Sequence, residues 1–506
     1  MLLDNNVDFN GKPFHFIGIG GIGMSALAHI LAKRQLPVSG SDIRSSDITQ
    51  RLKALGVHIF EQQDAANLEF FLPKSAPECQ ELPTPARSAG ASVLISEPHN
   101  EVSNLTTHAR ANLPQVICST AINTSNLEYR AALDLNCPIF HRSDLLAALI
   151  QNYQSIAVAG THGKTTTSSL VGYMLLQTGL DPTIVVGGEV NAWEGNARLG
   201  QSPYLVAEAD ESDGSLVKLS ATIGVVTNIE LDHPDHYGTL EEVVQTFQVF
   251  ANRCQTLIGC IDCATVRDRL RPNISYSIDA NTNADYTVTE IEYGAAGTTA
   301  RVWERGNELG ILNLRLLGGH NLSNALAAIA VGRLLGLDFA AIAANIATFT
   351  GARRRFELRG ETDGIAFIDD YAHHPSEIRA TLAAARLQAK SDNRVVAVFQ
   401  PHRFSRTLAF LPEFAQSFGH ADLVVISEIY SAGEPDLGQI SGEMLAAMIA
   451  EHHPQVTYQP LATLREYLTQ TLRSGDLALF LGAGNLNQVI PDAINSIRRR
   501  RVVEEL

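Results

Sequence analysis

Two glycine-rich loops, each lying between an apolar strand and a helix, constrain the possible fold of this chain most strongly. The first loop, Gly18–Gly23, follows the apolar run Phe14–Ile17 and leads into a helical run that ends at Lys33. The second loop, Gly160–Thr166, follows the apolar run Ser155–Ala159 and also leads into a helical pattern. Strand–glycine–helix units of this kind are typical of parallel sheets covered by helices on both faces. The two loops therefore predict α/β architecture.

Short apolar strands continue to alternate with helical runs towards the C-terminus, and 506 residues correspond to about three domains of ~150 residues. We therefore expect an α/β fold of three domains, each built on a mainly parallel sheet. The expected domains are a Rossmann-like N-terminal domain over 1–152, a P-loop-type central domain over 153–350 and a Rossmann-like C-terminal domain over 351–506. The proline-rich stretch 73–100 interrupts the alternation and is interpreted as a surface insertion.

The composition argues against several classes of protein. The chain carries 38 basic and 54 acidic residues, a net charge of −16, which disfavours binding to nucleic acids and anionic membranes. The apolar runs fall far short of the ~20 residues of a membrane span, and the polar, acidic N-terminus is unlike a signal peptide. We expect a soluble cytoplasmic protein with no nucleic-acid partner and no membrane insertion. Its oligomeric state stays unknown at this level.

The six cysteines are too few for a disulfide framework, which agrees with a reducing compartment. Cys260 and Cys263 form a Cys-x-x-Cys pair, but a zinc site would need a second pair at a suitable spacing. The run Thr256–Cys263 is therefore interpreted as a buried strand and its end.

The first glycine loop has the context of a diphosphate-binding site. Its glycines would let a diphosphate approach a positively polarised helix N-terminus, and Asp42, at the end of the next strand, is placed to accept ribose hydroxyls. This pattern alone is compatible with an NAD(P) domain, with another diphosphate ligand such as a UDP-sugar, or with a tight turn of purely structural value.

The second glycine loop has the features of a nucleotide phosphate site. Its backbone N–H groups would surround phosphates, Lys164 would reach the β/γ oxygens, and Thr165 would ligate Mg²⁺. The loop is a shortened variant, because Val158 stands where the strict Walker pattern has glycine. Carboxylates follow two later strands, in Glu208–Asp213 and at Asp232-His233, and hard oxygens beside a phosphate loop suit Mg²⁺.

Ten motifs, in order along nearly the whole chain, resemble those of the Mur ligase family, the ATP-dependent amino-acid ligases of peptidoglycan synthesis. They are HFIGIGGIGMSALA, VSGSD, GTHGKTTT, AEADESD, NIELDH, HNLSNALAA, FTGARRRFE, DDYAHHPSE, FQPHRFSRT and GAGN. Within the family they are most similar to the members that join L-alanine to UDP-N-acetylmuramate and form ADP and phosphate through an acyl phosphate. The nearest alternative within the family is a murein-tripeptide recycling ligase, from which the FQPHRFSRT segment differs.

The resemblance implies a role for each matching position, with ATP and Mg²⁺ as cofactors and UDP-N-acetylmuramate and L-alanine as partners. The implied catalytic residues are Lys164, Glu208, His233, His373, Arg403 and Arg406. The implied ATP-binding residues are Gly160, Thr161, His162, Gly163, Lys164, Thr165, Thr166, Asn321, Asn324, Arg355 and Asp370. The implied UDP-substrate residues are Gly18, Gly20, Gly21, Gly23 and Asp42. The implied metal ligands are Thr165, Glu208 and His233.

One departure from the family concerns the second Mg²⁺, which several relatives support with a carbamylated lysine. No lysine occurs here between Lys218 and Lys390, and Gln248 lies about where that lysine would fall. An amide forms no carbamate, so we expect His233, water and substrate oxygens to hold that ion. Two hypotheses from other functional classes remain. One is an NAD(P)-dependent oxidoreductase fused to an ATPase, and the other is a nucleotide-switched binding protein without catalysis.

Overall fold

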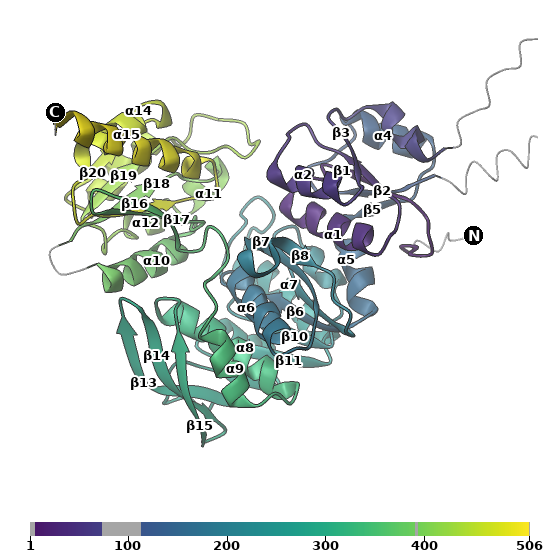
Figure 1. Cartoon of the computed structure of the whole chain (residues 1–506), viewed down its shortest axis with the longest axis horizontal. Helices are drawn as coiled ribbons and strands as arrows, with labels where there is room; N and C mark the ends of the chain where they lie inside the picture. The colour runs from purple at the N-terminus through teal and green to yellow at the C-terminus, as the bar shows by residue number, and fades with distance from the viewer. Residues whose placement is uncertain (1–5, 73–112, 390–392, 505–506) are drawn as a thin grey trace, which may run out of the picture. The chain divides into compact units, whose positions relative to one another are not determined.

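The computed structural model describes residues 6–72, 113–389 and 393–504, so the insertion expected at 73–100 lies outside the described residues. The chain divides into two compact units, Met1–Ala148 and Leu149–Leu506, and each is described by itself (Figure 1). Among the helices within the described ranges, none has both the length and the hydrophobicity that a membrane span requires.

The first unit is built on a five-stranded sheet of order β3-β2-β1-β4-β5, in which all neighbouring strands are parallel. Its strands are β1 (Phe14–Ile17), β2 (Val38–Ser41), β3 (His58–Phe60), β4 (Gln115–Cys118) and β5 (Ile139–His141). Its helices are α1 (Ile22–Lys33), α2 (Asp47–Ala54), the 3₁₀ helix η1 (Ala65–Phe71), α4 (Leu127–Asp134) and α5 (Arg142–Gln151), the last of which continues into the second unit. The strand β1 lies at the centre with every side chain buried, and the glycine loop follows it directly.

The second unit holds two sheets, of which the first has ten strands in the order β15-β14-β13-β12-β11-β10-β6-β9-β7-β8. Its strands are β6 (Gln154–Ala159), β7 (Thr183–Val190), β8 (Gly195–Arg198), β9 (Tyr204–Glu208), β10 (Ile223–Val226), β11 (Thr256–Cys260), β12 (Ile274–Tyr276), β13 (Tyr286–Gly294), β14 (Gly297–Glu304) and β15 (Asn307–Leu314). Its helices are α6 (Lys164–Gln177), α7 (Leu240–Arg253), α8 (Gly319–Leu334) and α9 (Phe339–Ile346), with the short turns η2 (Asn191–Trp193), η3 (Ser215–Lys218) and η4 (Val266–Leu270). The sheet is parallel from β7 to β13 and antiparallel at both edges.

The other sheet of the second unit has six strands in the order β16-β17-β21-β18-β19-β20, and only β16 is antiparallel to its neighbour. Its strands are β16 (Glu357–Thr362), β17 (Ile365–Asp370), β18 (Val395–Phe399), β19 (Leu423–Ile426), β20 (Val456–Tyr458) and β21 (Leu477–Leu481). Its helices are α10 (Pro375–Gln388), α11 (Phe404–Ala409), α12 (Leu411–Ala415), α13 (Gly442–Ala450), α14 (Leu461–Thr471) and α15 (Val489–Glu504), with the turn η5 (Leu486–Gln488).

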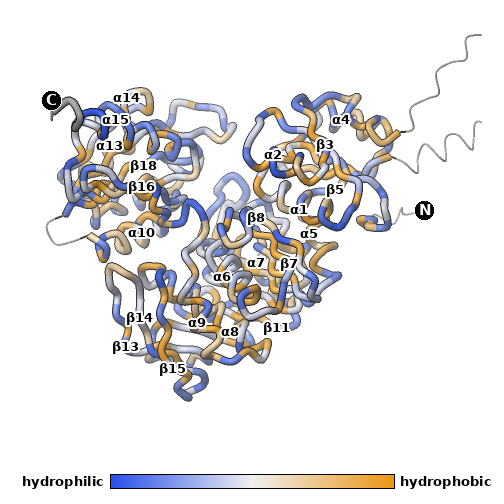
Figure 2. Tube along the Cα trace, in the orientation of Figure 1, coloured by the Kyte–Doolittle hydropathy of each residue, from blue (hydrophilic) through white to orange (hydrophobic). Residues whose placement is uncertain are grey.

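Separate apolar cores lie on the two faces of this six-stranded sheet, because successive side chains of a strand point to opposite faces. Val395, Ala397 and Phe399 of β18 contribute to one core, and Val396 and Val398 contribute to the other. Figure 2 shows apolar residues along the strands and hydrophilic residues in many of the connecting loops. Burial on both faces explains why these strands read as continuous apolar runs in the sequence.

The predicted fold class is confirmed, since the chain forms three mainly parallel sheets with helices packed against them. The predicted strand at Thr256 is also confirmed as β11, which ends at Cys260. The domain boundaries at 152/153 and 350/351 stay predictions, because the compact division of the chain falls at Ala148 and leaves the second and third sheets in one unit. The antiparallel strands β13–β15 were not expected from the sequence pattern.

Candidate functional site

The second glycine loop, Gly160–Thr166, follows β6 and runs into the first turn of α6. Gly160 and Gly163 have φ angles of 139° and 81°, a region that favours glycine. A Cβ at Gly163 would lie 2.6 Å from Asn324 Oδ1, and one at Gly160 would collide with the Thr227 hydroxyl. The loop is therefore packed closely against β10 and α8, and the N–H groups at the start of α6 are available to an anion.

Lys164 lies in a cluster of oxygens beside this loop. Its Nζ donates to Glu211 Oε1 at 2.8 Å, to the Gly160 carbonyl at 2.6 Å and to the Thr161 carbonyl at 3.1 Å. Burial lowers the pKa of Lys164, but the carboxylates of Glu211 and Asp210 outweigh it, and the pKa is raised overall. Burial is also the main cause that raises the pKa of Glu211 to about 7, against the attraction of Lys164. The lysine is therefore held as a cation at the second glycine loop, which is called the phosphate loop below because of its proposed ligand.

Two of the predicted metal ligands meet beside the loop. Thr165 Oγ1 lies 3.1 Å from Glu208 Oε1, and Glu208 Oε2 accepts the N–H of Gly187 at 2.7 Å. Glu208 ends β9, whose parallel pairing with β6 brings it to the edge from which the loop leaves. A hydroxyl and a carboxylate oxygen are hard donors, so this pair fits Mg²⁺.

The third predicted metal ligand, His233, lies beside the lysine cluster instead. Its Nε2 is 3.9 Å from Glu211 Oε1 and 3.6 Å from Asp232 Oδ2. Burial, together with Arg406 and Lys164, lowers its pKa although Asp232 opposes this, so the imidazole is neutral and suited to a metal.

Both predicted arginines of the six-stranded sheet contact the loop that carries His233. Arg406 Nη2 lies 2.8 Å from Asp232 Oδ1, and both side chains are almost fully buried. Burial alone would raise the pKa of Asp232, but Arg406 holds it well below its usual range. Arg403 Nη1 lies 2.5 Å from Asp235 Oδ2 in a partly exposed pair. The structure thus joins Arg403 and Arg406 to the same short segment.

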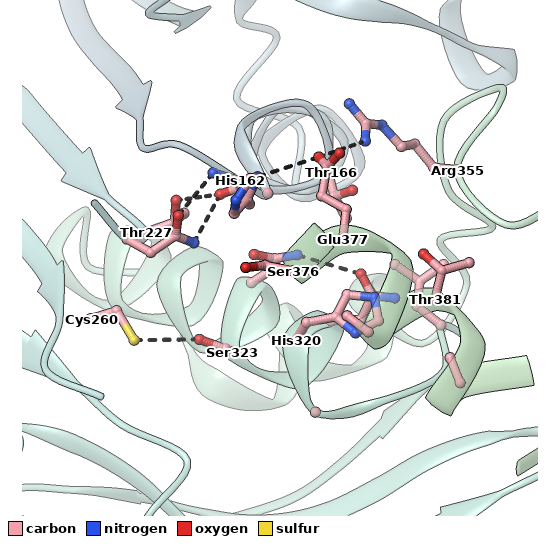
Figure 3. A pocket seen from close by; sticks show the side chains of 18 of the residues that line it. His162, Thr166, Thr227, Cys260, His320, Ser323, Arg355, Ser376, Glu377 and Thr381 are labelled. Atoms are coloured by element: carbon pink, nitrogen blue, oxygen red, sulfur yellow. Dashed lines mark hydrogen bonds and ion pairs between the residues drawn. The ribbon is translucent and has the colours of Figure 1, made fainter. Parts of the chain in front are cut away.

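A cavity of about 420 Å³ lies between the phosphate loop, α8 and the start of α10 (Figure 3). The predicted ATP-binding residues that line it are His162, Gly163, Thr166, Asn321, Asn324, Arg355 and Asp370. In its wall Asn324 Oδ1 accepts from the Thr167 hydroxyl at 3.0 Å, and Asn321 Nδ2 donates to the Leu317 carbonyl at 2.8 Å. The cavity is large enough for a small organic ligand.

Asp370 is held by backbone groups at the edge of the cavity. Its carboxylate accepts the N–H groups of Phe356 at 2.7 Å and Ala372 at 2.8 Å. Burial raises its pKa to about 6 although Arg355 opposes this.

Two cavity residues, Glu230 and Glu377, were missed among the predicted site residues although both lie inside quoted motifs. They flank His162: its Nε2 is 3.4 Å from Glu230 Oε2 and its Nδ1 is 3.4 Å from Glu377 Oε1. Burial would lower the pKa of His162, but these two carboxylates raise it to about 9. Carboxylates within NIELDH and DDYAHHPSE were the signal that could have identified them.

In the first unit, Asp42 lies against the glycine loop, and its predicted contact with ribose hydroxyls stays a prediction. Its Oδ2 accepts the N–H of Gly20 at 2.8 Å, and a Cβ at Gly20 would lie 2.7 Å from the same oxygen. Gly18 has a φ of 79°, and a Cβ at Gly23 would lie 3.0 Å from Arg142 Nη1. Gly21 is the N-cap of α1, so no side chain caps the first N–H groups of this helix.

Family models match three segments of the chain. The model described as "Mur ligase family, catalytic domain" matches residues 13–93 and 79–154. "Mur ligase middle domain" matches residues 158–332, and "Mur ligase, glutamate ligase domain" matches residues 354–484. The matched segments include the glycine loops, the metal-side carboxylates and both arginines.

Curated relatives match the chain from end to end. A protein of Nostoc punctiforme named UDP-N-acetylmuramate–L-alanine ligase is 70% identical over 98% of this chain and 98% of its own length. A protein of the same name from Gloeothece citriformis is 62% identical over 97% of this chain and 98% of its own length.

Solved structures share the fold. The UDP-N-acetylmuramate-alanine ligase MurC of Thermotoga maritima matches with a TM-score of 0.76 at 26% identity, over 97% of this chain and 99% of that chain. A murein peptide ligase of Psychrobacter arcticus matches with a TM-score of 0.67 at 22% identity, over 96% of this chain and 99% of that chain.

Proposed function

The chain belongs to the Mur ligase family, and from this premise we propose that it joins L-alanine to the lactyl carboxylate of UDP-N-acetylmuramate while converting ATP to ADP and phosphate. One observation supports this most directly: Thr165 of the Thr165–Glu208 pair lies next to Lys164 in the same glycine loop, and Lys164 shares Glu211 with His233, whose segment Arg403 and Arg406 contact. The relatives that are 70% and 62% identical over nearly the full length carry the name of this activity.

In the first step, an oxygen of the lactyl carboxylate attacks the γ-phosphorus of ATP, ADP leaves, and an acyl phosphate is formed. We assign Lys164 to the β/γ oxygens, because its charged Nζ lies at the loop within 2.6–3.1 Å of three oxygens. A positioned cation stabilises the charge that spreads over the transferred phosphoryl group. Arg355, which lines the cavity from the segment just before β16, is assigned to the ATP phosphates.

The proposed cofactor is Mg²⁺, for which Thr165 Oγ1 and Glu208 Oε1 are the fitting donors, with His233 as a further metal-side group. Bound Mg²⁺ would neutralise phosphate oxygens. Asn324 and Asn321 would recognise the adenine from the wall of the cavity, and Asp370 would lie near the ribose.

In the second step, the neutral amine of L-alanine attacks the acyl carbon, a proton leaves the nitrogen, and phosphate departs from the tetrahedral intermediate. Arg403 and Arg406 are assigned to the alanine carboxylate, which would aim the amine at the acyl carbon. Arg403 is the more accessible of the two, with 32% of its side chain exposed against 2% for Arg406. The alanine carboxylate would compete with Asp235 for Arg403.

The glycine loop of the first unit would hold the UDP part of the substrate, with Gly18, Gly20, Gly21 and Gly23 near the diphosphate and Asp42 near the ribose. Because both nucleotides are substrates, the cytoplasm is the location that we propose. The alternative within the family is a murein-tripeptide ligase, and the similarity to such a protein at 22% identity is a similarity of fold.

The test is phosphate release by the purified protein with ATP, Mg²⁺ and UDP-N-acetylmuramate, using L-alanine, glycine, L-serine and the tripeptide as acceptors. We expect release to depend on the UDP-sugar and to be fastest with L-alanine. Faster release with the tripeptide would favour the recycling ligase, and release without any acceptor would contradict ligation. A titration of nicotinamide fluorescence should give no saturable signal, which separates this function from an oxidoreductase.

A further inference from the structure

Glu377 contacts three side chains that the family resemblance assigns to the site, and no step above gives Glu377 itself a role. We propose that Glu377 is a positioning residue that holds His162 of the phosphate loop, Arg355 of the nucleotide cavity and His373 in their working arrangement through the negative charge of its carboxylate. The inference rests on the proposed function, because it concerns the same site.

The two oxygens of Glu377 face different groups. Its Oε1 lies 3.4 Å from His162 Nδ1 and 3.9 Å from Arg355 Nη1, towards the cavity (Figure 3). Its Oε2 accepts the backbone N–H of His373 at 3.0 Å and of His374 at 3.2 Å. The second set is the capping box of α10, in which Glu377 is the third helical residue. Capping alone needs only one oxygen, so the contacts of Oε1 are additional to it.

Glu377 is held in the ionised form. Burial would raise its pKa, but the Nδ1–H of His373 and the positive charges of His162 and Arg355 hold the pKa well below its usual range, and only 13% of the side chain is exposed. The N-terminus of α10 adds a favourable dipole. A buried carboxylate stays charged only when it is paired and hydrogen-bonded, so its partners are drawn to it.

The contact between Glu377 and His373 determines which ring nitrogen of His373 carries the proton. His373 Nδ1 lies 2.9 Å from the Tyr371 carbonyl and 3.2 Å from Glu377 Oε2, and both are acceptors. Burial lowers the pKa of His373 to about 4, so the ring is neutral and its one proton belongs on Nδ1. Nε2 then keeps a lone pair, which can accept a hydrogen bond from the amine of the acceptor amino acid. With so low a pKa the ring orients the amine rather than removing a proton from it.

The contact with His162 joins two parts of the second unit. His162 belongs to the loop before α6, and Glu377 belongs to α10, which packs on the six-stranded sheet. Beside this contact the Ser376 hydroxyl donates to Glu230 Oε2 at 2.7 Å. The charged His162 therefore lies between one carboxylate from each part, and the arrangement forms only when α10 reaches the phosphate loop.

The experiment compares Glu377→Gln with Glu443→Gln. Glutamine still serves as the capping residue of α10, but it replaces the charge and leaves only one acceptor oxygen. Glu443 is an exposed residue in the first turn of α13, so its variant repeats the same change of charge at a helix start outside the cavity. Steady-state kinetics with all three substrates, thermal melting and a pH–rate profile are measured for both variants and the parent.

For Glu377→Gln we expect kcat to fall by about 10²-fold, the scale of a misplaced reacting group, with the melting temperature within a few degrees of the parent. The KM for UDP-N-acetylmuramate should stay within about twofold, since its site lies in the first unit. Glu377→Asp keeps the charge and should recover part of the loss. Glu443→Gln should match the parent.

A double variant, His162→Asn with Glu377→Gln, tests the contact itself. If the two side chains act through one contact, the combined loss in kcat should be smaller than the product of the single losses. Full multiplicativity would overturn the role of His162 in the proposal.

The parent is assayed first, so that two failures are told apart. A parent without acceptor-dependent phosphate release contradicts the proposed function. If the parent is active and the Glu377→Gln variant is equally active, only the positioning role is contradicted. The positioning role is also contradicted if Glu377→Gln loses activity only because less of the protein is folded and Glu377→Asp shows the same loss.

Discussion

The two glycine loops share a backbone design and differ in the side chains around it. In the first unit the N–H of Gly20 is taken by the carboxylate of Asp42, and the loop sequence contains no cation. In the second unit the loop contains Lys164, and a hydroxyl and a carboxylate meet beside it at Thr165 and Glu208. If the proposed function holds, both glycine patterns would bind a phosphate, and the neighbouring side chains would decide whether it is only bound or also transferred.

Removing the cation of the second loop should have the largest effect. Lys164→Ala removes the point charge on the transferred phosphoryl group, and turnover should fall by at least ~10²-fold. Binding of UDP-N-acetylmuramate, measured by calorimetry, should survive because its proposed loop lies in the first unit. Near-normal turnover of the variant would show that the second loop is not the ATP site.

Adding a methyl group to each loop should separate the two by stability. At Gly160 a Cβ would collide with Thr227 at a φ of 139°, whereas at Gly18, with a φ of 79°, nothing lies within 4 Å. Gly18→Ala should cost only the backbone strain, on the order of 1–3 kcal/mol. Gly160→Ala should cost clearly more, seen as the larger drop in melting temperature by scanning calorimetry. Equal drops would contradict the close packing of the second loop.

Replacement of the two arginines that contact Asp232 and Asp235 should have different effects. Arg403→Ala should raise the KM for L-alanine much more than that for ATP, since its partner Asp235 is partly exposed. Arg406→Ala should also raise the alanine KM, and it leaves Asp232 buried without its partner, which costs about 3–5 kcal/mol of stability. Kinetics and melting curves check both; an unchanged alanine KM in the two variants would move the acceptor site elsewhere.

Histidines of the two units should respond to pH in opposite directions. Burial lowers the pKa of His29 in the first unit to about 4, so its contribution to stability is lost as the pH falls from about 6.5 towards 4. The pKa of His162 is raised to about 9 by Glu230 and Glu377 against burial, so its contribution is full below about 6.5 and is lost as the pH rises through 9.

Melting temperatures of the parent, His29→Asn and His162→Asn between pH 4 and 10 check this difference. The His29 variant should lose less stability than the parent on acidification, and the His162 variant should lose less at alkaline pH. Parallel curves for the parent and both variants would contradict the assigned pKa shifts.

Removal of CO₂ is expected to have no effect on activity. The amide of Gln248 donates to the Arg269 carbonyl at 3.3 Å, and an amide forms no carbamate. Activity should therefore be the same in CO₂-depleted and bicarbonate-containing buffer, and ¹³C-bicarbonate should give no carbamate signal. A lysine carbamate that supports turnover would contradict the proposed ligand set of the second Mg²⁺.

The local pattern of apolar and polar residues was sufficient to predict the strands and helices that flank the two glycine loops. Buried parallel strands such as β6 and β18 are short, apolar and followed by glycine or polar residues. This pattern can be recognised within a few residues of sequence. The hairpins of β13–β15 lack that alternation with helices. Their turn at Arg305-Gly306, with φ angles of 49° and 78°, was the available signal and was not recognised.

The sequence by itself was enough to predict which chemistry the chain carries, because the proposed phosphate site, a glycine loop with Lys164, Thr165 and nearby carboxylates, depends on residue type and short spacing. Only the tertiary structure decided which of the distant groups meet. Arg406 and Asp232 are 174 positions apart and form a buried pair, and Glu377 joins His162 across 215 positions. Such pairings depend on how the two sheets of the second unit pack, and hydrophobic packing is not encoded in the local spacing of charged residues.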